Sequence, residues 1–198
     1  METIENIQKE LKAILSEARY QHSIGVMKKA EELAKQYGID PHIASLVGLA
    51  HDIGKEMSNK EKMEYCQKHQ IEIDKVEQYN VGLLHAKVGA DITKKYGFTK
   101  EMQKAILYHT TAHADMDLLA KIIFIADKIE ENRSYDGVEE LRELAMQDID
   151  KCALVILNQT IKKNIDKGVL IHPDGIFARN QLLPLSMILE NVPKIFKH

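Results

Sequence analysis

Four histidines and two aspartates in this chain have side chains that bind metal ions, and two of the six are adjacent in the sequence. The set consists of His22, His51, Asp52, His85, His109 and Asp127. Four imidazoles and two carboxylates are enough to hold two metal ions that share one bridging carboxylate. Two neighbouring ions can activate a water molecule to attack a phosphate ester or anhydride. The residue types therefore predict a metal-dependent phosphohydrolase.

The adjacent pair His51-Asp52 is the most specific part of this set. Neighbouring side chains on a helix point about 100° apart, so both can reach one ion where a helix ends, and the second oxygen of Asp52 can reach another ion. Imidazole with carboxylate suits iron, manganese, zinc or nickel, whereas an all-oxygen set would suit magnesium or calcium. The remaining ligands must come from other helices, which is how the core of a helical bundle builds a metal site.

The elements that must position these residues are helices. Apolar residues recur at three- and four-residue steps almost throughout, and no segment shows sustained strict alternation. Gly38 ends one predicted helix, Asp40-Pro41 begins the next, and Ser58 to Glu61 reads as a capping box. The predicted helices run over about 4–15, 18–37, 41–54, a short segment from 58, 85–96, 99–110, 117–132, 137–146 and 149–167.

The fold class is therefore all-α, and the sequence predicts a single helical bundle over residues 1–198. Residues of about 18–135 would form the metal-site core, and the helices within about 137–198 would pack on it. A length of 198 residues, with 44% hydrophobic and 29% charged residues, suits one domain of ordinary globular composition. The chain contains no internal repeat or low-complexity linker that would divide it.

Composition also narrows the partners and the location. The net charge of −3 argues against electrostatic binding of nucleic acid or of an anionic membrane. No apolar run approaches the roughly 20 residues that a membrane span requires, and the acidic N-terminal segment lacks the apolar region of a signal peptide. Cys66 and Cys152 have no CxxC spacing and are expected to be free thiols in a reducing compartment. We expect a cytoplasmic protein that binds neither nucleic acid nor a membrane.

Five motifs in the chain match one known family. They are HDIGK (51–55), LHAKVGA (84–90), ILYHTTAH (106–113), ADKIEENRSYDGV (126–138) and IHPDGIFARN (171–180). With them the chain resembles the HD-domain metal-dependent phosphohydrolases, in particular the YqeK-type symmetrical bis(5′-nucleosyl)-tetraphosphatases. The resemblance extends from about residue 15 to about residue 190. Two positions depart from the pattern, because the subgroup commonly has proline in place of Glu131 and a residue other than histidine in place of His113.

This resemblance implies an HD-domain bundle, a cofactor and a reaction. The cofactor would be two metal ions, with iron as the first candidate and manganese, zinc or nickel as alternatives. One ion would be held by His22, His51, Asp52 and Asp127, and the other by Asp52, His85 and His109. The substrate would be diadenosine tetraphosphate, which a metal-activated hydroxide would cut symmetrically to two ADP. The resemblance also implies a homodimer.

Cationic and polar residues within the motifs are candidates for substrate contacts. Lys55 and Arg133 could bind phosphate, and we assign them, with Asp52, to the catalytic set. The alternatives are a solvated lysine and a salt bridge from Arg133 to Glu130 or Glu131. The full set of predicted substrate-binding residues is Lys55, Thr110, Thr111, Arg133, His172 and Arg179. For the two threonines and the last two residues, backbone hydrogen bonds and packing of the C-terminal segment explain the residue types almost as well.

Two other functions remain open from the sequence. The first is another nucleotide phosphohydrolase of the same family, such as a nucleotidase or a guanosine tetra- or pentaphosphate hydrolase, because its metal ligands would be the same. The second is a module that senses a nucleotide without hydrolysing it. A cyclic-dinucleotide phosphodiesterase is disfavoured, because the chain contains no GYP motif.

Overall fold

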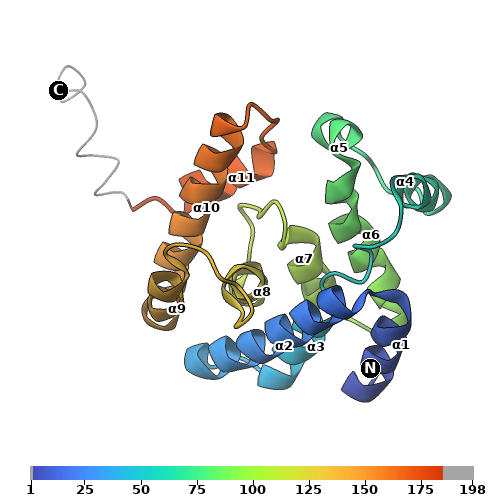
Figure 1. Cartoon of the computed structure of the whole chain (residues 1–198), viewed down its shortest axis with the longest axis horizontal. Coiled ribbons are helices and arrows are strands. Elements are labelled where there is room, and N and C mark those ends of the chain that lie inside the picture. Colours follow the sequence, from blue (N-terminus) through green and yellow to red (C-terminus); the bar gives the residue numbers. More distant parts are fainter. Residues whose placement is uncertain (1, 185–198) are drawn as a thin grey trace.

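The computed structural model describes residues 2–184, and over this part the chain forms helices and connecting loops without a strand (Figure 1). The all-α prediction is confirmed. The α-helices are α1 (Ile4–Ile14), α2 (Glu17–Tyr37), α3 (Pro41–Ala50), α4 (Asn59–Lys68), α5 (Lys75–Tyr79), α6 (Leu84–Ile92), α7 (Lys100–Tyr108), α8 (Leu118–Ile129), α9 (Val138–Gln147), α10 (Ile149–Asp166) and α11 (Pro173–Gln181). Two short 3-10 helices, η1 (Val81–Leu83) and η2 (Thr93–Tyr96), precede and follow α6.

Local sequence explains where the helices that position the cluster begin and end. The Ser16 side chain accepts the N–H of Arg19 at the start of α2, and Gly38 ends that helix with a φ of 71°. Asp40 accepts two backbone N–H groups at the start of α3, where proline occupies the first turn. The predicted capping box at Ser58 forms at the start of α4. These caps set the register in which α2 and α3 present their histidines.

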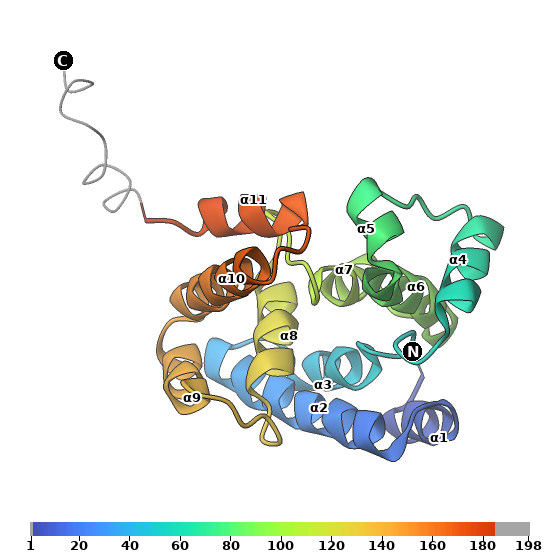
Figure 2. The same cartoon turned by 45° about the horizontal axis from the view of Figure 1, so that its top comes forward.

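Helix α8 is the buried axis of the fold (Figure 2). Asp117 caps its first turn, and Ile122, Ile123 and Ile125 are fully buried. Helices α2 and α3 lie side by side and both pack against α8, as do α7, α9 and α10, while α6 packs on α7. Because α8 is surrounded in this way, its one aspartate, Asp127, is held inside the protein.

The structure differs from the predicted elements at five places. Helix α3 stops at Ala50, and residues 51–54 form turns where the sequence predicted the end of the helix. Helix α6 stops at Ile92 and continues as η2, and α8 stops at Ile129 because Glu130 is extended, with φ −57° and ψ 159°. The sequence pattern did not delimit α5, which has 5 residues, or α11, which begins at Pro173. The part of the predicted C-terminal packing that falls on residues 185–198 lies outside the described residues.

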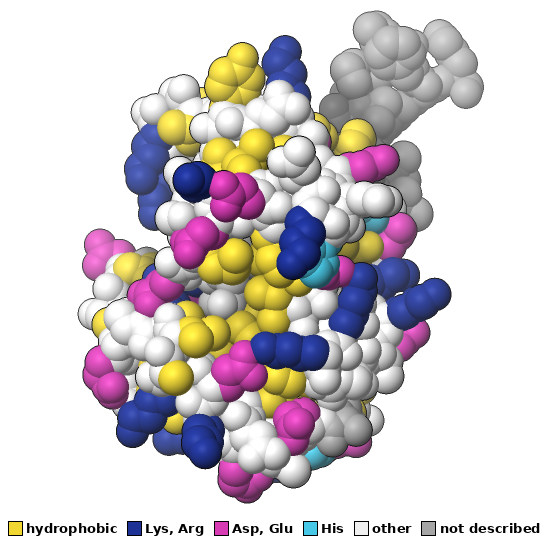
Figure 3. All heavy atoms as spheres, turned by 90° about the vertical axis from the view of Figure 1, so that its right-hand side faces the viewer, with side chains coloured by type: hydrophobic (Ala, Val, Ile, Leu, Met, Phe, Trp, Pro, Cys, Tyr) yellow, Lys and Arg dark blue, Asp and Glu magenta, His cyan; other side chains and the backbone are white. Residues whose placement is uncertain are grey.

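On the side of α1, α4 and α6, apolar side chains gather in a band with charged side chains on either side of it (Figure 3).

Both cysteines, Cys66 and Cys152, are buried and unpaired. Within residues 2–184, no helix combines the length and the apolar character needed to cross a membrane.

Candidate metal centre

Five helices bring the six predicted ligands together inside the bundle. The contributors are α2 (His22), the end of α3 (His51 and Asp52), α6 (His85), the end of α7 (His109) and α8 (Asp127). All six side chains are buried, with 0–8% of their surface exposed. The structure therefore places the six residues in one cluster, which we call the His/Asp cluster.

The Asp52 carboxylate lies between two groups of histidines. Its Oδ1 atom is 3.2 Å from Nε2 of His85 and 3.5 Å from Nε2 of His109. Its Oδ2 atom faces the other group, 3.4 Å from Nε2 of His51 and 3.9 Å from Nε2 of His22. The carboxylate can therefore offer one oxygen to each of two sites.

Asp127 adds a second carboxylate to one of these groups. Its Oδ1 atom is 3.0 Å from Nε2 of His22 and 3.9 Å from Nε2 of His51. The donor atoms of His22, His51 and Asp127 all lie within 4.8 Å of one another, and so do those of the trio His51, Asp52 and His109. Each trio could hold a metal ion.

Hydrogen bonds at Nδ1 fix the orientation of the histidine rings. His51, His85 and His109 donate Nδ1–H to the carbonyl oxygen three residues earlier, at 2.7 Å for His51 and 2.6 Å for the other two. His22 donates instead to the carboxylate of Glu130, at 3.1 Å. Because these oxygens only accept, the proton of each neutral ring is assigned to Nδ1, which leaves the lone pair of Nε2 pointing into the cluster.

The cluster contains buried acceptor atoms that lack donors. The Nε2 atoms of His22 and His51 and the Oδ1 atom of Asp52 have no hydrogen-bond partner. The Nε2 atoms of His85 and His109 lie 3.1 Å apart, and the donors beside them are the Lys55 ammonium, 3.2 Å from His85, and the Thr110 hydroxyl. Buried acceptors in this arrangement are unfavourable unless a cation lies between them. The donor set therefore fits a divalent transition metal.

The protonation states of Asp52, Asp127 and His109 favour metal binding, whereas burial of His51 is outweighed by its carboxylate neighbours, which raise the pKa of this ring. Burial opposes ionisation of Asp52, but His51, His109 and His85 together outweigh it and hold the pKa of this carboxyl well below its usual range. Burial also opposes ionisation of Asp127, and here Lys128, His22, His51 and His109 together outweigh it and keep the pKa well below its usual range. Burial lowers the pKa of His109 to about 4. Both carboxylates are thus ionised and His109 is neutral near pH 7, which are the forms that bind metals.

Four basic side chains border the two carboxylates of the cluster. Arg19 donates to Oδ2 of Asp52 at 2.8 Å, and Nζ of Lys55 lies 3.9 Å from Oδ1. Lys128 and Arg133 contact the other carboxylate, at 2.5 Å and 2.8 Å. All four are partly exposed, and burial lowers the pKa of Lys55. They therefore form a cationic border between the cluster and the solvent.

The two predicted threonines differ in their distance from the cluster. Thr110 borders it, because its hydroxyl is 3.1 Å from Nε2 of His85 and 3.0 Å from Nε2 of His109. The Thr111 hydroxyl donates to the carbonyl oxygen of Ala112 at 3.2 Å. Such a backbone hydrogen bond is the alternative to substrate binding that the sequence left open for these threonines.

The two predicted substrate contacts near the C-terminus belong to α11. His172 caps this helix, and its Nε2 atom is 2.8 Å from Oδ2 of Asp74. Arg179 donates to the side chains of Asn158 and Asn180, at 3.0 Å and 3.1 Å. His172 also lines two small cavities of about 200 Å³ and about 110 Å³. The substrate contacts of His172 and Arg179 remain predictions.

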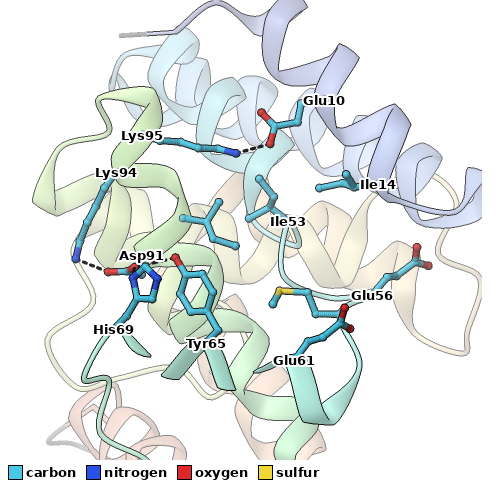
Figure 4. A pocket seen from close by; sticks show the side chains of 12 residues that line it. Glu10, Ile14, Ile53, Glu56, Glu61, Tyr65, His69, Asp91, Lys94 and Lys95 are labelled. Carbon is cyan, nitrogen blue, oxygen red and sulfur yellow. Dashed lines mark hydrogen bonds and ion pairs between the residues drawn. The ribbon is translucent and has the colours of Figure 1, made fainter. Parts of the chain in front are cut away.

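A larger cavity lies behind the loop of residues 51–58. It measures about 750 Å³ and is lined by side chains from α1, α4, α6, η2 and this loop (Figure 4). Ile53 and Glu56 face it from the loop, and Lys94 pairs with Asp91 on its wall. None of its lining residues belongs to the His/Asp cluster. The donor atoms that could hold a metal ion converge at the cluster and not in this cavity.

Three residues that contact the cluster were not predicted from the sequence as parts of it: Arg19, Lys128 and Glu130. Arg19 precedes His22 by three residues on α2, a spacing that places both on one helix face and could have revealed it. Lys128 directly follows a predicted ligand. Glu130 was considered only as a salt-bridge partner of Arg133, whereas its carboxylate contacts His22.

Known proteins similar to this chain match it over most of its length. A family model described as HD domain matches residues 19–132, which contain the whole His/Asp cluster. The symmetrical bis(5′-nucleosyl)-tetraphosphatase of Halalkalibacterium halodurans is 39% identical over 175 residues, which cover 87% of this chain and 93% of that protein. A protein of the same name from Bacillus subtilis is 32% identical over 175 residues, covering 87% of this chain and 94% of its own. A crystal structure from Clostridium acetobutylicum, described as a predicted HD superfamily hydrolase involved in NAD metabolism, matches with a TM-score of 0.89 and 39% identity, covering 94% of this chain and 99% of that one.

A helical bundle with a buried group of histidines and aspartates defines the class of the protein as an HD-domain hydrolase. The chain belongs to the HD domain family and, within it, to the family of the symmetrical bis(5′-nucleosyl)-tetraphosphatases. Membership of the HD family implies binding of a divalent metal ion, and the two trios of the cluster could hold one.

Proposed function

We propose that this chain hydrolyses diadenosine tetraphosphate symmetrically to two ADP, at a site that holds two metal ions. The placement of Asp52 carries the proposal, because one carboxylate can serve two ions when its oxygens face different donors. The names of the relatives support the substrate and the symmetry of cleavage. One ion would be held by His22, His51, Asp52 and Asp127, and the other by Asp52, His85 and His109.

Metal ions at this site would lower the pKa of water and offset negative charge on the phosphoryl oxygens. Symmetrical hydrolysis breaks the central anhydride of the tetraphosphate. The oxygen of water joins one inner phosphorus atom, and the former bridging oxygen leaves with the second ADP. The chain contributes two ionised carboxylates, Asp52 and Asp127, and histidine rings whose Nδ1 bonds aim Nε2 inward. Iron is the first candidate for the metal, and elemental analysis of purified protein would identify it.

The cationic border would bind the phosphate chain. Arg19, Lys55 and Arg133 pair with the carboxylates of the cluster while remaining partly exposed, so they can turn toward an anionic substrate. A guanidinium binds two phosphate oxygens at once, which favours the two arginines for the inner phosphates. The Thr110 hydroxyl lies beside the same rings and can donate to a phosphoryl oxygen.

Product analysis tests the proposed reaction. Purified, iron-loaded protein would be incubated with diadenosine tetraphosphate, and the products would be separated by ion-exchange chromatography. We expect ADP as the only nucleotide product. ATP with AMP would contradict symmetrical cleavage. Faster cleavage of NAD or of guanosine tetraphosphate would assign the site to another nucleotide, and absence of turnover with metal bound would favour a sensing module.

A further inference from the structure

One histidine of the cluster has an acceptor unlike the others. Three rings donate Nδ1–H to main-chain carbonyl oxygens, whereas His22 donates to the carboxylate of Glu130 at 3.1 Å. We propose that Glu130 is a positioning residue, which fixes the tautomer of His22 and strengthens its Nε2 as a metal ligand. This inference rests on the metal site of the proposed function. It means that the ion beside His22 and Asp127 is bound by a more electron-rich imidazole than the ion beside His85 and His109.

Glu130 is held rigidly enough for this role. Its side chain is buried, with 1% of the residue exposed, and it follows the last turn of α8. Its Oε2 atom accepts the backbone N–H of Asn132 at 2.7 Å, which leaves Oε1 facing His22. Nε of Arg133 lies 3.9 Å from Oε1, too far for a direct hydrogen bond. The imidazole of His22 is therefore the direct hydrogen-bond partner of Oε1 among the described residues.

The chemical effect follows from the charge of the acceptor. A carboxylate that accepts the Nδ1 proton of a metal-binding histidine fixes the ring tautomer and raises the basicity of Nε2. A neutral carbonyl oxygen also fixes the tautomer, but it withdraws the proton less strongly. Nε2 of His22 lies 3.0 Å from Oδ1 of Asp127 and has no hydrogen-bond donor, so it is oriented toward the proposed metal site.

Helix α2 makes room for this carboxylate at Gly25. A Cβ atom added at this buried glycine would lie 2.3 Å from Oε2 of Glu130 and 3.3 Å from the side-chain nitrogen of Asn132. Glycine destabilises a helix interior relative to alanine, so its presence there is consistent with the space that Glu130 occupies. His22 and Gly25 are three residues apart on one helix face, and α2 therefore supplies both the ligand and the space for its acceptor.

Mn²⁺ binding tests the proposal through a quantity other than activity. The number of Mn²⁺ ions per chain and their dissociation constants would be measured by electron paramagnetic resonance. In Glu130→Gln we expect one of two ions to bind about 10- to 100-fold more weakly, while the other is unchanged. Glu131→Gln is the matched control, because Glu131 is exposed and pairs with Lys29 and not with His22. Equal Mn²⁺ affinities in Glu130→Gln and wild type would overturn the proposal.

The ring tautomer of His22 gives a second readout, in metal-free protein. Nitrogen-15 NMR should show a single Nδ1–H tautomer in wild type and a mixture of tautomers in Glu130→Ala, which removes the acceptor oxygen. A merely structural role for Glu130 would lower the melting temperature without changing the tautomer. An unchanged tautomer in the variant would therefore contradict the positioning role.

Gly25→Ala provides an independent test, because the added Cβ atom would meet the Glu130 carboxylate and not the backbone. We expect it to displace the Glu130 carboxylate and weaken the same Mn²⁺ ion. In a Glu130→Ala background it should cause no further loss, since the space is then free. If Gly25→Ala lowers the Mn²⁺ affinity equally with and without Glu130→Ala, the proposed coupling between Gly25 and Glu130 is wrong. His22→Ala tests separately whether His22 is a metal ligand. If this variant keeps two tightly bound ions, the assignment of His22 as a ligand is wrong.

Discussion

Arg19 has two opposed effects on the proposed site, and its replacement should separate them. Its guanidinium donates to Oδ2 of Asp52 at 2.8 Å, so it occupies the oxygen that the metal site of His22 and His51 would use. It also stands at the partly exposed border where phosphate would enter. We expect Arg19→Met to raise metal affinity while lowering the rate of hydrolysis.

The size of the metal effect can be worked from the ion pair. Two unit charges whose centres are roughly 4 Å apart attract by about 1 kcal/mol in water and about 4 kcal/mol at an effective dielectric constant of about 20. The Arg19 side chain is 31% exposed and that of Asp52 is 3% exposed, which places the pair between these limits. An intermediate value of about 2 kcal/mol corresponds to roughly 30-fold in an equilibrium constant. We therefore expect the first Mn²⁺ ion to bind up to about 30-fold more tightly in Arg19→Met.

The assay combines Mn²⁺ titration with steady-state kinetics on the same preparations. A lost charge-assisted phosphate contact is worth about 1.5–3 kcal/mol, so kcat/KM should fall at least about tenfold. Lys28→Met is the control, because Lys28 is an exposed lysine elsewhere on α2. Weaker Mn²⁺ binding in Arg19→Met would refute the competition argument, and an unchanged kcat/KM would refute the phosphate contact.

Further expectations follow from other parts of the molecule. Lys55→Met and Arg133→Met should each keep two ions yet lower kcat/KM at least about tenfold; wild-type kinetics in both would remove these residues from the site. Burial opposes ionisation of Asp74, but backbone N–H groups of α5 and the His172 ring hold its pKa at about 2, below the ordinary value. This stabilisation is present above the ordinary pKa and is lost as pH falls toward 2. The difference in melting temperature between wild type and Asp74→Asn should therefore narrow from about pH 5 downward. A difference that does not change with pH would contradict stabilisation by the ionised Asp74 carboxylate. Ile123→Ala empties a fully buried position and should lower the free energy of unfolding by about 2–5 kcal/mol, measured by urea denaturation; a loss below 1 kcal/mol would mean that α8 is not tightly packed. Light scattering tests the homodimer that the family resemblance implies, and a single-chain mass would contradict it.

The fold class and the grouping of the six His and Asp residues could be predicted from the sequence because both depend on local signals. Apolar residues at helical spacing indicate the bundle wherever a helix is long enough to show a period. Asp127 interrupts a helix that is otherwise almost entirely apolar, and a carboxylate in such a helix needs a partner. The signals fail for short elements: α5 has only 5 residues, and His172 fills the cap of α11 in place of the usual serine, threonine, aspartate or asparagine.

Contacts that depend on the packing of distant helices could not be predicted. Glu130 and His22 are separated by 108 positions, and the sequence offers Arg133, three residues away, as the obvious partner of the glutamate. Only the approach of α2 to the end of α8, with Gly25 leaving space between them, brings the carboxylate to the imidazole. The same limit applies to Asp52, since a sequence shows that it has two oxygens but not that they face different histidines.

The central claim is that Asp52 joins two metal sites. Anomalous X-ray scattering from crystals of the protein soaked in Mn²⁺ would locate the ions directly. We expect two peaks on opposite sides of the Asp52 carboxylate, one beside His22 and Asp127 and the other beside His85 and His109. A single peak, or peaks that Asp52 does not separate, would contradict the account.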